Sequence, residues 1–348
     1  MEDRLALQER TVGKDQGGQS GCRKACLVML LVGVAAFAML GILGIGLLSV
    51  VFGSDWKLRA GGYPEDERPR LRERWSYGSG TAKAVRLPLE GLIIHERKSG
   101  LLVPQFDRVE AVLRQIRAAA ADVAVRGMLL EVQSPGGSVS ACDEIREQLH
   151  RFREDGRRKV VVWVRGLAAS GAYYIASEAD WIVAQPGSLV GSIGVLLSAL
   201  NWSQLGEKIG VTDVTVKSGR YKDLLNPFRG VSPEELQMLQ AVVDSAHEMF
   251  VRHVAVGRKL ELARVARIAD GRIVTARRAE ELGLVDEVGY WPLAARRLRE
   301  LLGIEGLKVI RYEGSGGLLQ LLAAAGRGLP FSSVEFTREP RLLFLWRP

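Results

Sequence analysis

The sequence predicts an α/β protein in which a mostly parallel sheet is flanked by helices and preceded by one N-terminal transmembrane helix. Short β-rich runs alternate with amphipathic helical stretches, which is typical of parallel strands joined by crossover helices. Such a sheet is expected to be covered on both faces. The chain has 348 residues, 47% hydrophobic and 25% charged, which is enough for one large domain. One uncharged stretch, residues 25–53, stands apart from this pattern.

Residues 25–53 are apolar almost throughout. A helix rises about 1.5 Å per residue, so about 20 apolar residues cross a bilayer and this stretch is long enough to span one. A cleaved signal peptide is the alternative, but its apolar core is usually shorter and ends in a small-residue cleavage pattern that residues 51–55 lack. We predict an uncleaved anchor at 25–53, preceded by a separate segment at 1–24. Arg and Lys flank both ends, so charge does not decide the orientation.

Residues 54–82 are polar and contain Gly, Pro and mixed charges, so we expect a linker there. The domain that follows is expected to span residues 83–312. Its strands are predicted at 85–94, 127–132, 159–164, 181–184, 211–216 and 307–312. Its helices are predicted at 106–121, 140–152, 233–256 and 291–302, together with a short helix capped by Thr275 that ends at Gly283. No chemistry is assigned to the tail, residues 313–348.

The candidate nucleophile is Ser170, within a phrase of very small residues at 166–177. A polar loop gives way there to an apolar helical pattern, which can present one hydroxyl beside the free N–H groups of a helix N-terminus. A serine hydroxyl needs a neighbouring base, usually His but Lys in a known variant. Lys222, in the block at 217–223, is the candidate base.

Each of these residues also has an ordinary explanation. A serine at a helix start is more often an N-cap, and a lysine is almost always a solvated surface residue. The Pro-Gly-Gly sequence at 135–137 would more often be only a turn. Ser192 could likewise be a turn hydroxyl. The order and combination of the motifs are therefore stronger evidence for a catalytic function than any single residue.

Four blocks, at 134–138, 168–174, 191–194 and 217–223, resemble the signature blocks of the signal peptide peptidase A family. This family comprises bacterial membrane-anchored serine peptidases with a Clp/crotonase-like fold. The resemblance covers about residues 83–312, and the blocks come in the family's order. The spacing between the serine and the lysine is similar to that of the short, single-repeat form.

The resemblance implies a role for each matching residue. Ser170 would be the nucleophile, Lys222 the general base, and Ser192 a hydroxyl that steadies the lysine nitrogen. The backbone N–H groups of Gly137 and Gly171 would form the oxyanion hole. Because a lysine acts as a base only when neutral, we predict that Lys222 is buried in an apolar pocket beside Ser170.

The resemblance also implies a location, partners and substrates. Residues 1–24 would be cytoplasmic, and the catalytic domain would lie outside the bacterial inner membrane, in a periplasm or facing the exterior. Assembly would give a homo-octameric ring in which adjacent protomers contribute serine and lysine. The substrates would be signal-peptide remnants and other membrane-associated peptides, bound extended as an added strand.

Three alternatives remain at this stage. A Ser-His-Asp site would need one of the four histidines, His95, His150, His247 and His253, and none lies in a small-residue phrase. A crotonase-type acyl-CoA enzyme would explain neither the anchor nor Lys222. A catalytically inactive membrane scaffold, similar to the stomatin-associated branch of these proteases, is the third.

No cofactor, metal or nucleic-acid partner is expected. Cys22 and Cys26 have no neighbouring His or further Cys, and Cys142 is alone in the large domain, so we expect neither a metal site nor a disulfide within that domain. The formal net charge of +8 is spread along the chain, as in an ordinary solvated surface.

Overall fold

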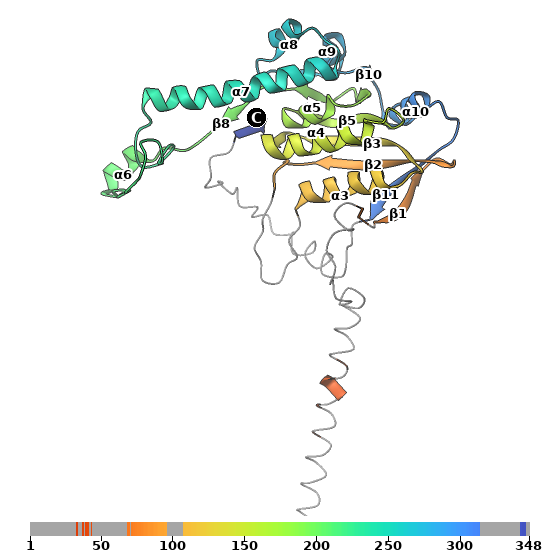
Figure 1. The fold of residues 1–348 in the computed structure, drawn as a ribbon, viewed down its shortest axis with the longest axis horizontal. Helices are drawn as coiled ribbons and strands as arrows, with labels where there is room; N and C mark the ends of the chain where they lie inside the picture. Colours follow the sequence, from red (N-terminus) through yellow and green to blue (C-terminus); the bar gives the residue numbers. More distant parts are fainter. Residues whose placement is uncertain are drawn as a thin grey trace, which may run out of the picture. The chain divides into compact units, whose positions relative to one another are not determined.

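A nine-stranded sheet forms the centre of the described part of the chain (Figure 1). The computed structural model describes residues 71–95, 107–313 and 342–345, with a few isolated positions before residue 70. The chain divides into two compact units, Met1–Gly62 and Tyr63–Pro348, and the elements named here belong to the second. In chain order they are β1 (Arg72–Tyr77), β2 (Ala82–Glu90), α3 (Arg108–Ala121), β3 (Val125–Ser134), β4 (Gly136–Ser138), α4 (Val139–Arg153), β5 (Lys159–Ala169), α5 (Gly171–Ala176), β6 (Trp181–Ala184), β7 (Leu189–Gly191), β8 (Leu196–Leu197), α6 (Ser203–Ile209), α7 (Pro233–Gly257), α8 (Leu262–Ile268), β9 (Ile273–Thr275), α9 (Ala276–Leu282), β10 (Glu287–Val288), α10 (Trp291–Leu302), β11 (Leu307–Glu313) and β12 (Leu342–Leu345).

The sheet is mostly parallel, with strand order β1-β11-β2-β3-β5-β6-β10. Strand β7 pairs with the far end of β5, and β9 pairs with β7. Only the β1–β11 and β7–β9 pairs are antiparallel among the described strands of this sheet. The prediction of a mostly parallel sheet flanked by helices is therefore confirmed.

Helices α3 and α4 help cover one face of the sheet (Figure 1). Alternate residues of the central strands, such as Met128 and Leu130 of β3 and Val162 of β5, point into this core and are fully buried. Ile145 of α4 packs in the same cluster. Each such side chain contributes about 1.5–3 kcal/mol on burial, so the many apolar residues of this face dominate the stability of the domain.

The opposite face holds a smaller core under α10. Leu129 of β3 and Trp163 of β5 pack there with Leu298 of α10. The same face also carries Glu131, which is 3% exposed and pairs with Arg86 at 2.7 Å. A helix and a largely buried ion pair therefore share this side of the sheet.

Most elements occur where the sequence predicts them. Strands β2, β3, β5, β6 and β11 and helices α3, α4, α7, α9 and α10 match predicted segments, including the Thr275 cap and the left-handed Gly283 that ends α9. The strand predicted at 211–216 is wrong, because this segment is irregular and exposed. Its valines alternate with polar residues as in a strand, but no described strand pairs with it, and Val214 and Val216 are exposed.

The sheet reaches into the range expected to be a linker. Strand β1 lies within residues 54–82 and pairs with β11, in a register that sets Arg74 opposite Arg311. The polar, charged side chains of β1 led the sequence analysis away from a strand, but an edge strand of a sheet is often charged. Residues Arg72–Tyr77 are thus part of the folded domain.

The described residues contain no helix that is both long and apolar enough to cross a bilayer. The anchor predicted at 25–53 falls almost entirely outside the described residues. It stays a prediction.

A second, three-stranded sheet has the order β4-β12-β8, and both of its pairs are antiparallel. Its central strand, β12, comes from the tail to which the sequence analysis assigned no chemistry. In Figure 1, β12 lies beside β8 near the mark for the C-terminus. This small sheet adjoins the residues described next.

Candidate active site

Ser170 lies where β5 ends and α5 begins, and it is only 1% exposed. Its backbone has φ 54° and ψ −120°, a conformation that costs a non-glycine residue on the order of 1–3 kcal/mol. The surroundings hold it there: the Ser170 N–H donates to the Gly191 carbonyl at 2.8 Å, and the Ser170 carbonyl accepts from the Tyr174 N–H at 2.9 Å. Strain of this kind clusters at functional sites, so the backbone singles out this serine.

Ser192 lies beside Ser170 because β5 and β7 are parallel neighbours. Their register pairs Ala169 with Gly191, so each serine follows directly after a paired residue. Ser192 also has a positive φ, 52°, and is 7% exposed. The Ser170 hydroxyl donates to the Gly194 carbonyl over a long 3.4 Å, which leaves its oxygen available for chemistry. The structure thus brings these two motif blocks together, and the block at 134–138 adjoins them through the pairing of Ser134 with Ala168.

Gly137 and Gly171, the two expected oxyanion donors, lie in tightly packed backbone near Ser170. A Cβ atom on Gly137 would collide with the Ile93 carbonyl oxygen, and one on Gly171 would collide with Cys142 Sγ. These positions therefore require glycine and hold the backbone firmly, as pre-organised donors must be held. Burial raises the pKa of the Cys142 thiol far above its usual range, so this neighbour is chemically inert.

Lys222 lies elsewhere, in the turns between β8 and α7. We call residues 198–231 the lysine segment. Lys222 is exposed, and within the described chain its ammonium group makes no hydrogen bond or ion pair, with Ser170 or with any other residue. The expectation that Lys222 is buried beside Ser170 is therefore not met inside a single chain.

Arg229 fixes the backbone next to Lys222. Its guanidinium contacts both carboxylate oxygens of Asp223, at 2.9 and 3.0 Å, and reaches Glu235 at 2.9 Å. Hydrogen bonds from Arg229 and then Lys217 hold the pKa of Asp223 well below its usual range, and Arg229 lowers the pKa of Glu235 to about 2. Glu235 also belongs to the capping box that starts α7.

Sequence reasoning missed Arg229. The one available signal was the Ser-x-x-Glu capping box at the start of α7, which fixes Glu235 as a partner for a nearby cation.

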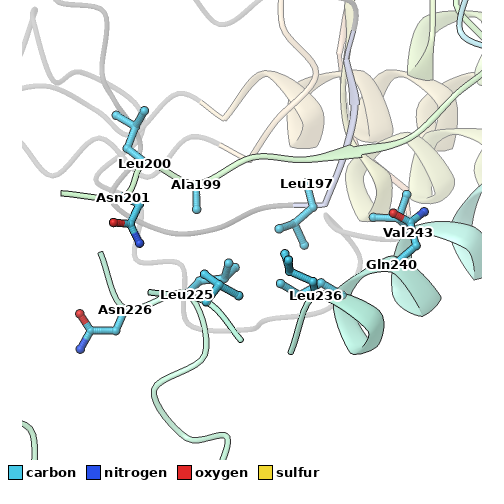
Figure 2. Close-up of a pocket in the computed structure, with 11 residues that line it drawn as sticks. Leu197, Ala199, Leu200, Asn201, Leu225, Asn226, Leu236, Gln240 and Val243 are labelled. Carbon is cyan, nitrogen blue, oxygen red and sulfur yellow. The ribbon is translucent and has the colours of Figure 1, made fainter. Parts of the chain in front are cut away.

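A cavity of about 280 Å³ lies between β8, the lysine segment and α7. Figure 2 shows Leu197, Leu225 and Leu236 around it, with Asn201 and Asn226 at one side. Its lining includes no titratable side chain. The cavity can therefore receive an apolar group, but it cannot itself supply the proton chemistry.

All four histidines are described, and none hydrogen-bonds the Ser170 hydroxyl: His95 bonds Asp107, His150 bonds Glu178, His247 bonds the Ala269 carbonyl, and His253 packs on Tyr174. A Ser-His-Asp site therefore has no support within the described chain. The described residues also contain no group of three or more His, Cys, Asp or Glu placed to hold a metal ion.

Comparison with known proteins places the chain in a family. Residues 152–305, a range that includes Ser170 and Lys222, match the model of peptidase family S49. A protein of Enterococcus faecium named for signal peptide peptidase SppA is 37% identical over 238 residues, which are 68% of this chain and 68% of that protein.

Two further relatives carry the name of a protease. The one from Methanocaldococcus jannaschii is 38% identical over 210 residues, 60% of this chain and 67% of its own length. The one from Synechocystis is 36% identical over 236 residues, 68% of this chain and 80% of its own length. With a strained buried serine within the matched region, the chain belongs to peptidase family S49 and is a protease of the signal peptide peptidase A type.

Proposed function

We propose that the protein is a membrane-anchored serine endopeptidase that degrades cleaved signal peptides and other membrane-associated peptides. One observation carries the catalytic part of this proposal. Ser170 is held buried and strained at the end of β5, between Ser192 and the glycine backbone at 137 and 171. The name of the Enterococcus faecium relative supports the substrate class.

The chemistry is acyl transfer. Ser170 Oγ attacks the carbonyl carbon of the peptide bond while its proton passes to the neutral amine of Lys222. The N–H groups of Gly137 and Gly171 stabilise the oxyanion of the tetrahedral intermediate. Lys222 then gives the proton to the leaving amine, and water hydrolyses the acyl-enzyme. Ser192 orients the Lys222 amine.

We propose that a neighbouring copy of the chain supplies Lys222. The exposed position of Lys222 in the single chain supports this, because a second copy packed against it could bury the amine beside a serine. The lysine segment also exposes many apolar side chains: Leu200, Trp202, Leu205, Ile209, Val211, Val214, Val216 and Phe228. Such a concentration is typical of a protein–protein interface. A closed ring, here a homo-octamer, would cover this surface and complete each site.

The proposed location is the bacterial inner membrane. The apolar residues 25–53 would span it once, with residues 1–24 in the cytoplasm and the catalytic domain outside. Substrate peptides released in the membrane would then reach the protease without crossing the cytoplasm.

A fluorophosphonate probe tests the catalytic proposal directly, because it reacts with activated serines. We expect covalent labelling of Ser170 in the intact protein and none in Ser170→Ala. Peptide digestion with mass spectrometry of the cut sites, again with Ser170→Ala as the control, should show endoproteolysis. Absence of labelling and cleavage would instead support a catalytically inactive scaffold.

Mixed assemblies test whether a neighbouring copy of the chain supplies Lys222. Ser170→Ala and Lys222→Ala chains are each expected to be inactive alone. Together in one verified mixed ring, they should recover a fraction of wild-type activity, because some sites receive an intact serine and an intact lysine. A mixed ring with no activity would contradict the sharing of sites.

A further inference from the structure

The chain that follows β2 pairs with the short strand that carries Gly137. Ile93 forms a parallel bridge with Gly137. The Ile93 N–H donates to the Gly136 carbonyl, and the Ile93 carbonyl accepts from the Ser138 N–H, each at 2.9 Å. Ile93 is 3% exposed, so water competes little for these hydrogen bonds. We call residues 91–95 the clamp segment, because they hold β4 in place.

The bridge sets the direction of an expected oxyanion donor. The Gly136 carbonyl and the Gly137 N–H belong to one peptide unit, which is planar and trans. Because Ile93 holds the carbonyl of this unit, the Gly137 N–H must point to the opposite side, away from the clamp segment. A shift of Ile93 would turn the whole peptide plane. The position of the clamp segment therefore controls where the Gly137 N–H points.

The clamp segment is anchored at both ends. At its start, the Gly91 carbonyl accepts from the fully buried hydroxyl of Ser134 at 2.6 Å. At its end, the two ring nitrogens of His95 reach two carboxylates. Nδ1 lies 2.7 Å from Asp107 Oδ2, and Nε2 lies 3.2 Å from Glu144 Oε2. The second anchor thus depends on a single titratable side chain.

The two partners of His95 are themselves held by helices. Asp107 is the N-cap of α3, and its Oδ1 accepts from two N–H groups of the first turn, at 2.9 and 3.3 Å. This leaves Oδ2 for His95. Glu144 belongs to α4, which begins directly after β4. Because α3 and α4 pack against each other (Figure 1), His95 ties the clamp segment to one firm structure.

Both contacts together require the charged form of His95. A neutral imidazole has one N–H and an imidazolium has two, whereas an ionised carboxylate only accepts. Partial burial disfavours the charge, but the hydrogen bond and charge of Asp107 and then those of Glu144 outweigh it and raise the pKa of His95. The guanidinium of Arg108, the residue after Asp107, lies near Gly91 instead.

We propose that His95 is a positioning residue for the oxyanion hole, and that it holds the Gly137 N–H in its working direction only while both of its ring nitrogens are protonated. The role of the Gly137 N–H rests on the proposed function of Ser170. As the pH rises through the pKa of His95, one of the two contacts is lost and the clamp segment loosens. This effect opposes the gain in activity that deprotonation of a lysine base brings over the same range.

Steady-state kinetics of the full-length protein on a fluorescence-quenched peptide test the proposal. His95→Gln should lower kcat about tenfold at pH 6.5 and leave KM within about twofold, because an oxyanion donor acts mainly in the transition state. The ratio of the wild-type kcat to the His95→Gln kcat should fall at least about threefold between pH 6.5 and pH 9, because the wild type itself loses the second contact.

His95→Arg is the rescue variant. Arginine stays charged at every pH of the assay and can donate to two carboxylates. This variant should keep most of the wild-type kcat at pH 6.5, and its advantage over His95→Gln should not decline towards pH 9. No rescue by Arg, together with a pH-independent ratio in the wild type, would show that the charge of His95 has no such role.

His150→Gln is the matched control. His150 is also a partly exposed histidine paired with a carboxylate, that of Glu178 at 2.9 Å, but it lies in the last turn of α4, at the opposite end from β4. Its kcat should stay within about twofold of the wild type at both pH values. An equal loss of kcat in the two variants, or a rise in KM as large as the fall in kcat, would overturn the proposal.

Hydrogen exchange gives a second test that needs no catalysis. In the full chain with Ser170→Ala, the N–H groups of Ile93 and Ser138 should exchange slowly, because both are hydrogen-bonded in the bridge. Adding His95→Gln should speed their exchange about tenfold at pH 6.5, measured by mass spectrometry of peptic fragments, whereas adding His150→Gln should not. Unchanged exchange in the His95 variant would overturn the proposal.

The outcomes separate this inference from the proposed function. If exchange at Ile93 and Ser138 responds to His95 but the wild type neither reacts with a fluorophosphonate nor cleaves peptides, the clamp is present and the serine mechanism fails. If the wild type cleaves peptides while neither kcat nor exchange responds to His95, the mechanism stands and this inference fails.

Discussion

The serine site, formed by Ser170, Ser192, Gly137 and Gly171, differs sharply from the lysine segment. The serine site lies at strand ends in the main core, where Ser170 is 1% and Ser192 7% exposed. The lysine segment has no long helix or strand, and Val216 within it is 96% exposed. Within the described chain, the residues of the serine site lie together, whereas Lys222 is exposed and apart from them.

The two regions are held in place by different interactions. The buried region can hold a strained backbone because dense packing over-determines it. The exposed region instead depends on a local ion-pair network around Arg229. The two regions should accordingly respond to different perturbations.

Gly137→Ala should disrupt the serine site and cause the largest loss of activity among these variants. The added methyl group meets the Ile93 carbonyl oxygen, so the strand must move and the oxyanion donor with it. We expect kcat/KM for peptide cleavage to fall about 100-fold or more, since loss of one such donor costs about that much. Gly166→Ala, where a Cβ atom meets open space, is the control and should stay near wild type. Similar activity of the two variants would refute the tight-packing argument.

Lowering the pH should decrease the stability of the folded domain, because His253 is buried. Burial, and then the charge of Arg146, lowers the pKa of His253 to about 4. Glu178 lies 3.6 Å from His253 but is already paired with Arg153 at 3.0 Å. An unfolded histidine has a pKa of about 6.5, so the unfolded state takes up a proton first and the folded state loses stability as pH falls from about 6.5 towards 4.

Between pH 7.5 and 5 this loss should be about 2 kcal/mol in the free energy of unfolding, measured by denaturant titration. His253→Leu should flatten the pH dependence over that interval. An equal slope in the wild type and the variant would show that His253 is not the group responsible.

Arg229→Leu tests whether the lysine segment depends on its ion-pair network. Loss of the contacts to Asp223 and Glu235 frees the backbone beside Lys222, so we expect kcat/KM to fall about tenfold, as for other positioning contacts. Arg229→Lys should restore only part, because lysine cannot bridge two carboxylates with a planar fork. Arg220→Leu, which removes a more exposed arginine, should have a smaller effect; equal losses in the two variants would argue against the network.

Val216→Ser should have the smallest effect on the single chain. An exposed valine contributes little to folding, so the free energy of unfolding should change by less than about 0.5 kcal/mol. If the lysine segment forms a contact between copies, the same change should shift sedimentation towards smaller assemblies. Val256→Ser, at an exposed valine of α7 outside the segment, should leave assembly unchanged.

The fold was predictable where local pattern and tertiary environment agree. Buried parallel strands such as β3 read as continuous apolar runs, and α7 carries its own capping box, so both were found. Residues 211–216 alternate apolar and polar side chains as a strand does but pair with no described strand, whereas β1 pairs with β11 although its sequence is charged. Strand pairing is set by contacts distant in sequence, which local pattern does not contain.

The candidate site was also predictable only in part. Ser170, Ser192, Gly137 and Gly171 were predicted from short motifs and a family resemblance, and their catalytic roles stay predictions. The structure shows that the two serines have positive φ and that the two glycines are closely packed. The exposure of Lys222 has no signal in its motif, and Arg229 acts through charges six residues away on either side. Phe344 lies in a short apolar run with no motif, so its place beside Gly137 could come only from the structure.

The pairing of β12 with β4 and β8 has a consequence for the timing of biogenesis. The ribosome makes β12 after every other described strand, and translation of the residues between β8 and β12 takes on the order of ten seconds. Strands β9, β10 and β11 are made within that interval, and until its end the edges of β4 and β8 that β12 later covers lack their partner. A newly made molecule is thus briefly more prone to aggregation through those edges than the finished one.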